Sequence, residues 1–232
     1  MMKTLKRTLP ILLIIGMLFC AGCASSGGNT PKAEEPSRNE TMLDLIGMPK
    51  DEVLTALSLE EADLTEYSPD TYMTPAEITY VGVKMRILLQ FATIEDTPVL
   101  NGFTYMAEYQ NEPDRAAKEM LAVTKEIQAV YGTPDVGSSS PAWEMTESEI
   151  AAAITDQKRP LANEYKWFME EPASSYMEDY INQVAQLPAY QQLSMEPGYR
   201  CLLRLSAYTQ EGEDKPTAFL QLIYEVGAVE TP

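Results

Sequence analysis

Histidine is absent from this 232-residue chain, cysteine occurs only three times, and 17 basic residues stand against 35 acidic ones. Without histidine there can be no Ser-His-Asp or Cys-His triad, no HExxH zinc site and no imidazole acid–base catalyst. A formal net charge of −18 argues against a general nucleic-acid-binding protein, which needs a basic surface for the phosphates. The chain has a single long apolar run, near the N-terminus, so we expect no polytopic membrane protein. A composition that is 45% hydrophobic is too apolar for a chain that is disordered throughout.

The first 22 residues have the order of a signal peptide. Lys3, Lys6 and Arg7 form a positively charged n-region, and an apolar stretch follows at 11–19. This stretch is much shorter than the ~20 residues that a transmembrane helix needs, so it predicts a signal-peptide h-region.

The residues that follow the apolar stretch indicate lipid attachment. Ala21 and Gly22 are small and precede Cys23, as lipoprotein signal peptidase requires once a diacylglycerol is attached to that thiol. The pattern resembles the bacterial lipobox, although Cys20 stands where leucine is usual. The resemblance implies a lipoprotein signal peptide at 1–22, with Cys23 acylated by fatty acids such as palmitate. An ordinary secretory peptide or a short uncleaved anchor is the alternative.

Cleavage before Cys23 would remove three basic residues and no acidic one, leaving 14 basic residues against 35 acidic ones and a formal charge of −21. An anionic membrane would repel such a domain, so the lipid must provide the attachment. Residues 23–41 are rich in Ser, Gly, Asn and Pro, which predicts a flexible tether. We therefore expect a lipid-anchored protein of the cell membrane that faces outside the cytoplasm, on the periplasmic side or at the cell surface.

Residues 42–232 predict a single α+β domain without a strong internal repeat. Apolar residues recur with helical spacing at 45–57, 113–131, 146–154 and 175–187, and they alternate as in strands at 80–91, 103–109, 164–169, 199–208 and 217–226. This order predicts an antiparallel sheet of about five strands in a two-layer fold. We expect the helices to pack on one face, with an inserted helical segment. Cys201 alternates with Leu203 and Leu205, which indicates a small buried side chain and not a nucleophile.

The opening of this domain resembles a known group of proteins. Residues 45–53 read Leu-Ile-Gly-Met-Pro-Lys-Asp-Glu-Val and run on to Leu54 and Leu57. They are similar to the GMxxxEVxxxLG opening of small bacterial envelope lipoproteins, the outer-membrane-assembly and β-lactamase-inhibitor-like modules. The likeness covers about a dozen residues and departs from the pattern at 58–60, where a Gly-x-Pro is usual. It implies a helical opening before an antiparallel sheet, in a binding module that is not an enzyme.

The sequence contains no pattern that identifies catalysis. It has no EF-hand loop, no phosphate-binding glycine-rich loop and no Ser-x-x-Lys motif, and the pair Gly27-Gly28 lies in the tether. We therefore expect no enzyme, no catalytic residue, no cofactor and no metal. A carboxylate-dependent hydrolase is the alternative, because with so many acidic residues some pair will lie close in space.

Basic residues gather on one predicted surface of this acidic chain. If the more apolar side of each strand packs on the helices, the opposite side carries five cations and two tyrosines: Lys84, Arg86, Lys166, Arg200, Arg204, Tyr80 and Tyr208. This surface would suit an anionic ligand or an acidic partner. Alternatively, Glu108, Glu164 and Glu225 lie on the same side and pair with the cations. The sequence favours pairing, because cross-strand charge pairs are common on a half-exposed sheet.

These observations lead to one expected function and two alternatives. We expect a membrane-anchored extracytoplasmic lipoprotein that acts as a non-catalytic binding or envelope-assembly module. Its partner would be another envelope protein or an anionic ligand, and not a nucleic acid. The alternatives are a solute-binding or sensing lipoprotein that uses the basic side of the sheet, and the carboxylate-dependent hydrolase.

Overall fold

The computed structural model describes residues 42–138, 141–169, 171–193, 196–209 and 215–229. The signal peptide, Cys23 and the tether predicted from the sequence lie outside the described residues.

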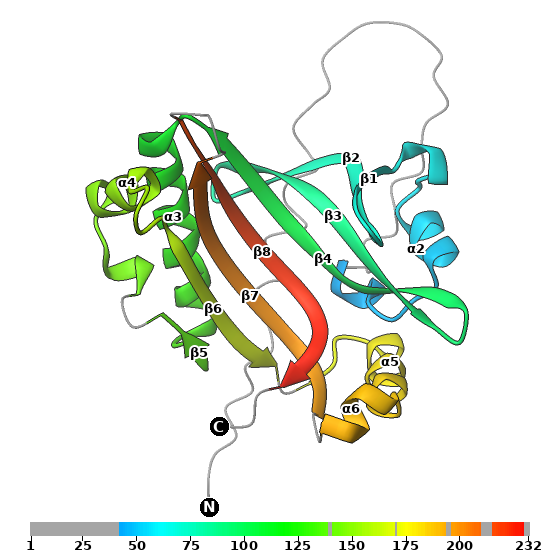
Figure 1. The fold of residues 1–232 in the computed structure, drawn as a ribbon. Coiled ribbons are helices and arrows are strands. Elements are labelled where there is room, and N and C mark those ends of the chain that lie inside the picture. Colours follow the sequence, from blue (N-terminus) through cyan, green and yellow to red (C-terminus); the bar gives the residue numbers. More distant parts are fainter. Residues whose placement is uncertain (1–41, 139–140, 170, 194–195, 210–214, 230–232) are drawn as a thin grey trace, which may run out of the picture.

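Eight strands form one open, fully antiparallel sheet in the order β1-β2-β3-β4-β8-β7-β6-β5 (Figure 1). The α+β class is confirmed, but the expectation of about five strands is wrong. Strands β1–β4 and strands β5–β8 are two meanders, joined where β4 pairs with β8. Each meander runs in chain order from one edge of the sheet to its middle, so the two halves of the sheet have the same topology. The strands are β1 Thr65–Ser68, β2 Thr71–Tyr80, β3 Val83–Ile94, β4 Thr97–Gln110, β5 Val136–Gly137, β6 Ala162–Met169, β7 Glu196–Thr209 and β8 Pro216–Val229.

The helices lie behind the sheet and at its ends in the view of Figure 1. Helix α3 lies behind the sheet and α4 packs beside α3 at the left of the view, whereas α5 and α6 form an insertion between β6 and β7 at one end of the sheet. α3 begins at Pro113, where a missing N–H costs nothing, and ends before Gly132, whose φ is 78°. The helical segments are η1 Met42–Leu45, α2 Lys50–Ala56, η2 Glu61–Asp63, α3 Pro113–Tyr131, η3 Ala142–Glu144, α4 Glu147–Thr155, α5 Ser175–Ala185 and α6 Pro188–Leu193.

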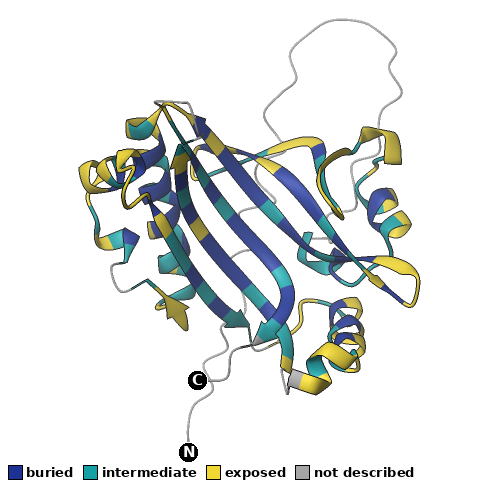
Figure 2. Ribbon diagram, in the orientation of Figure 1, coloured by how far each residue is buried: buried dark blue, intermediate teal, exposed yellow. Residues whose placement is uncertain are grey.

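The main hydrophobic core lies between the sheet and the helices. Alternate residues of the long strands are buried, so the strand ribbons show bands of buried residues (Figure 2). Met85 and Leu89 of β3 and Leu203 of β7 belong to the same buried cluster as Met120 and Ile127 of α3. Each large apolar side chain buried in this way contributes about 1.5–3 kcal/mol, which fixes the side of each strand that faces the helices.

The N-terminal part of the domain is attached to the middle of the sheet by backbone contacts. Gly47 donates its N–H to the carbonyl of Leu100 in β4 (2.8 Å), and Leu100 donates back to the carbonyl of Met48 (2.9 Å). The register between β3 and β4 shifts here, and the side chain of Asn101 accepts a hydrogen bond from the hydroxyl of Tyr180 in α5 (2.8 Å). Segments far apart in the sequence are thus joined at this irregularity.

Side-chain caps fix the starts of two helices. Thr146 and Glu149 form a capping box at the start of α4. At the start of α5 the side chain of Ser174 accepts the N–H of Met177. Ser174 also donates to the carbonyl of Asp44 (3.2 Å), and this contact connects α5 to η1.

A strand predicted at 80–91 is interrupted by a hairpin turn. Tyr80 pairs with Val83 across the two-residue turn Val81-Gly82, so Tyr80 belongs to β2 and not to β3. Both turn residues have positive φ, 50° and 79°, as in the tight turns that connect antiparallel strands. Strands β1, β2 and β5 have no counterpart among the predicted elements.

Candidate functional site

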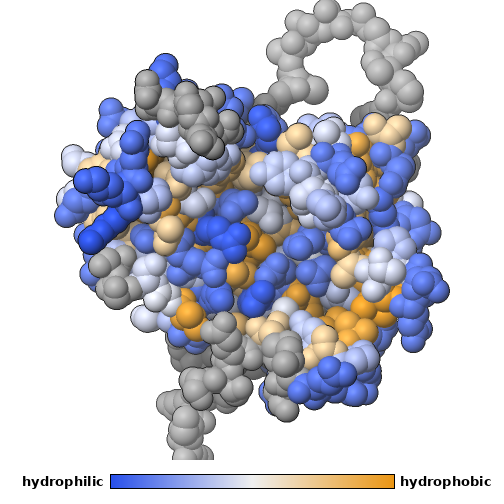
Figure 3. Space-filling model, viewed as in Figure 1, coloured by the Kyte–Doolittle hydropathy of each residue, from blue (hydrophilic) through white to orange (hydrophobic). Residues whose placement is uncertain are grey.

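One side of the sheet carries most of the predicted site residues, and we call it the charged face. It lies opposite the main core and is defined by Lys84, Arg86, Glu108, Glu164, Lys166, Arg200, Arg204, Tyr208 and Glu225. The pairing registers of β3, β4, β8, β7 and β6 place these side chains on one side of the sheet. Figure 3 shows hydrophilic side chains over the middle of the sheet on the side that it presents, with apolar ones between them.

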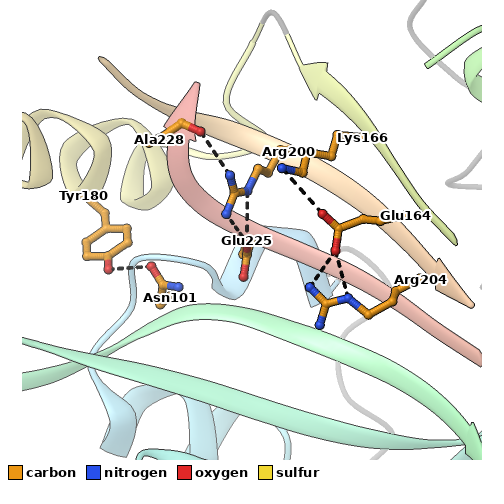
Figure 4. A network of polar contacts seen from close by, with 8 residues as sticks. All are labelled: Asn101, Glu164, Lys166, Tyr180, Arg200, Arg204, Glu225 and Ala228. Atoms are coloured by element: carbon orange, nitrogen blue, oxygen red, sulfur yellow. Dashed lines mark hydrogen bonds and ion pairs between the residues drawn. The ribbon is translucent and has the colours of Figure 1, made fainter. Parts of the chain in front are cut away.

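Glu164 is shared by two cations of the charged face (Figure 4). Its Oε2 accepts a hydrogen bond from Nε of Arg204 (2.8 Å) and forms an ion pair with Nη2 of the same guanidinium (2.7 Å), and its Oε1 lies 3.5 Å from Nζ of Lys166. Partial burial opposes ionisation of Glu164, but the hydrogen bond and charge of Arg204, helped by Lys166, lower its pKa below the ordinary value. The carboxylate of Glu164 is therefore ionised at neutral pH.

Arg200 forms a second, more buried ion pair. Its Nε donates to Oε1 of Glu225 (2.9 Å), and its Nη1 donates to the carbonyl of Ala228 (3.0 Å). The side chains of Arg200 and Glu225 are only 20% and 15% exposed. Little of the guanidinium is left for a ligand, so this pair connects β7 and β8.

Lys84 and Arg86 form the part of the charged face that is not neutralised. Both are exposed, and in the part of the chain that the structure describes neither lies within ion-pair distance of a carboxylate. Arg86 donates from Nη1 to the sulfur of Met73 (3.8 Å), although Glu77 occupies the paired position on β2. The pairing predicted from sequence thus holds for Lys166, Arg200 and Arg204 but not for these two cations.

The two predicted tyrosines lie on opposite sides of the sheet. Tyr208 is on the charged face, 45% exposed, and its ring stacks on Phe219 at 5.5 Å between centroids. Tyr80 is wrongly placed by the sequence, because the turn before Val83 puts it on the core side. Its pKa is raised by burial and by the nearby charge of Glu126 in α3, which agrees with a position between the sheet and α3.

A band of apolar residues lies beneath the polar groups of the charged face. Leu88, Met106, Leu202 and Ile223 are all at most 8% exposed and lie on the side opposite the main core. Polar side chains lean over some of this band, since the amide of Gln221 donates to the sulfur of Met106 (3.8 Å). The charged face is therefore a thin polar layer over apolar side chains.

Cys201 lies on the core side among tyrosine hydroxyls. It is fully buried, and burial raises the pKa of its thiol well above the ordinary value, although hydrogen bonds with Tyr224 and Tyr131 oppose this shift. The hydroxyls of Tyr131 and Tyr224 are 3.4 Å apart. Since the nucleophile is the thiolate, Cys201 acts as a packing residue, as the sequence predicts.

An open groove of about 530 Å³ lies on the other half of the molecule, between α2, η2 and the turn that joins β3 to β4. Asp51, Glu60 and Glu61 contribute to its lining. Lys50, which also lines it, is held by Glu61 at 2.6 Å and lies 4.1 Å from the ring centroid of Tyr72. Within residues 42–229, as far as the structure describes them, no three acidic, cysteine or histidine side chains form a metal-ion cluster.

The sequence missed residues that shape the charged face without carrying charge. Gly227 and Gly102 lie beside the Arg200–Glu225 pair, where a Cβ atom would contact the paired side chains. Both glycines interrupt runs of larger strand residues, which was an available signal for a close approach. Glu77 and Met73 were missed because β2 was not predicted.

Comparisons with known proteins add no family to these observations. No protein-family model, no curated protein and no solved structure matches the chain. Among the helices described, none is long and apolar enough to cross a membrane.

Proposed function

We propose that this protein is a membrane-anchored extracytoplasmic lipoprotein that acts as a non-catalytic binding or assembly module of the cell envelope. The observation that carries the proposal is the order of a basic n-region, a short apolar stretch and Ala21-Gly22-Cys23. A diacylglycerol on Cys23 would hold the acidic domain at the membrane through the tether of residues 23–41.

The surface of the domain supports a binding role. Arg86, Arg204 and Tyr208 are exposed on the charged face, and arginine and tyrosine are the residue types enriched at protein interfaces. By contrast, the one thiol among the described residues is buried with a raised pKa. These features favour recognition of a partner over covalent catalysis.

Crosslinking in living cells followed by affinity capture tests this proposal. We expect a reproducible envelope partner with the wild-type protein, and loss of that partner with Cys23→Ala, because the domain is then no longer anchored. Cys20→Ala is the matched control, since it also removes a thiol but leaves the residue expected to carry lipid. The same partner captured equally from Cys23→Ala, or none from the wild type, would contradict the proposal.

A second candidate is a sensor of an anionic solute. It is favoured by Lys84 and Arg86, two exposed neighbours on the charged face that lack an ion pair among the described residues. Thermal unfolding with and without millimolar inorganic phosphate separates the two candidates. A rise in Tm that disappears in Lys84→Gln/Arg86→Gln supports the sensor, whereas an unchanged Tm disfavours it.

A further inference from the structure

Two guanidinium groups on the charged face keep donors that the described residues do not use. Arg204 gives Nε and Nη2 to a single carboxylate oxygen of Glu164, and Figure 4 shows its remaining terminal nitrogen pointing away from that carboxylate. Arg86 donates to the sulfur of Met73, which is a weak acceptor. Both arginines are exposed. They are therefore available for charge-assisted hydrogen bonds with an anionic partner.

The register of the sheet fixes the separation of these two arginines. Arg86 pairs with Met106, Met106 with Gln221, and Gln221 with Arg204, across β3, β4, β8 and β7. Three strand spacings separate them, about 14 Å. One carboxylate or phosphate cannot contact both. In an extended peptide, acidic side chains four residues apart lie on the same side and about 13 Å apart, which matches this separation.

One aromatic contact is available on the same face. Tyr208 is 45% exposed and stacks on Phe219 farther along β7 and β8, whereas Leu88, Ile223 and Leu202, in the row beside the arginines, are buried. An extended acidic segment could therefore contact the two arginines and the ring of Tyr208. Exposed arginines and a tyrosine on one surface are typical of protein interfaces.

The charge of the whole chain argues against a lipid as the occupant. The mature chain would carry a formal charge of −21, so an anionic bilayer would repel it at distances within a Debye length. A small anion would need a site that encloses it, whereas the two arginines are spread over a broad sheet surface. A short acidic segment of a protein avoids both difficulties, because the rest of the partner need not be acidic.

We propose that an acidic segment of a partner protein lies across β3, β4, β8 and β7, with two of its carboxylates bound to Arg86 and Arg204. This inference rests on the proposed function, for which it names the chemistry of the partner.

Site-specific photocrosslinking of the full-length protein in the cells that produce it tests the inference. A diazirine side chain replaces Gln221, which lies between the two arginines. We expect a crosslink to a peptide with two acidic residues about four positions apart, and roughly tenfold or greater loss of its yield in Arg86→Gln/Arg204→Gln, as for interface hot spots. Lys118→Gln/Lys125→Gln, on the exposed side of α3, removes the same charge and should leave the yield unchanged.

Arg86→Gln alone keeps the test independent of folding, because Arg86 has no ion pair among the described residues and should not change Tm. We expect this single change to lower the crosslink yield severalfold. A crosslink to lipid, to a peptide without paired acidic residues, or with a yield unaffected by the arginine changes would overturn the inference, as would no crosslink. If the Cys23-dependent partner persists in any of these cases, the proposed function stands and only this assignment fails.

Discussion

Arg200 on β7 and Glu225 on β8 form an ion pair for which Gly227 leaves the space. The guanidinium donates to Glu225 at 2.9 Å and to the carbonyl of Ala228 at 3.0 Å. A Cβ atom on Gly227 would lie 2.7 Å from Cζ of Arg200. The missing side chain thus gives the guanidinium its place at the end of the charged face.

Gly227→Ala should destabilise the protein only while Arg200 is present. The added methyl group displaces the guanidinium and weakens hydrogen bonds to a charged group, which are each worth about 1.5–3 kcal/mol. In an Arg200→Gln background the hydrogen bonds of the guanidinium are already absent, so the alanine should be neutral or slightly stabilising. Urea unfolding of the four proteins of this double-mutant cycle gives the coupling. Equal effects of the alanine in both backgrounds would show that the glycine serves another purpose.

The two arginines of β7 should contribute unequally to stability. Arg200→Gln leaves the carboxylate of Glu225, 15% exposed, without its partner, and we expect a loss of about 1–3 kcal/mol. Arg204 is 45% exposed, so Arg204→Gln should cost less than about 1 kcal/mol. Denaturant unfolding at neutral pH measures both values. The reverse order would contradict the assignment of Arg200 to structure and of Arg204 to binding.

Stability should fall in acid partly through Glu164. Arg204 and Lys166 lower its pKa in the folded protein below the ordinary value of 4.5. A group with a lowered folded pKa contributes stability above its unfolded pKa and loses it as the pH falls through the folded pKa. The stability difference between wild type and Glu164→Gln should therefore be greatest near neutral pH and shrink below about pH 4.3. A difference that stays constant from pH 7 to pH 3 would exclude this linkage.

Val81→Asn should stabilise the protein. Val81 has a φ of 50° in the turn between β2 and β3, a conformation that is costly for a β-branched residue. Its side chain is 44% exposed, so little packing is lost on substitution. Asparagine favours positive φ, and Asn-Gly is the preferred two-residue hairpin turn. We expect a gain of about 1 kcal/mol, measured by thermal unfolding, and a lower Tm would refute the turn assignment.

The same turn explains the main error in the prediction from sequence. Apolar alternation runs without a break from Val81 through Phe91, and Val-Gly is not a typical hairpin signal, so nothing in the local pattern marks the reversal. The turn changes the side of the sheet on which Tyr80 lies. Strand β2 was missed because exposed residues, with Pro75 among them, interrupt its alternation.

The charged face was largely predictable within strands but not between them. Period-two alternation in β3 and β7 correctly placed Arg86, Arg200 and Arg204 on one side. Which cation meets which carboxylate depends on cross-strand register, which is set by turns and by the irregularity at Asn101. Arg204 and Lys166 share Glu164, whereas Arg86 has no ion pair among the described residues. This difference emerges only from the three-dimensional structure.

Mass spectrometry of the mature N-terminal peptide tests whether lipid on Cys23 anchors the protein. We expect the mature chain to begin at Cys23 and to carry the mass of a diacylglyceryl group on that residue. A mature chain that begins elsewhere, or an unmodified Cys23 thiol, would contradict membrane anchoring by lipid and the proposed function that depends on it.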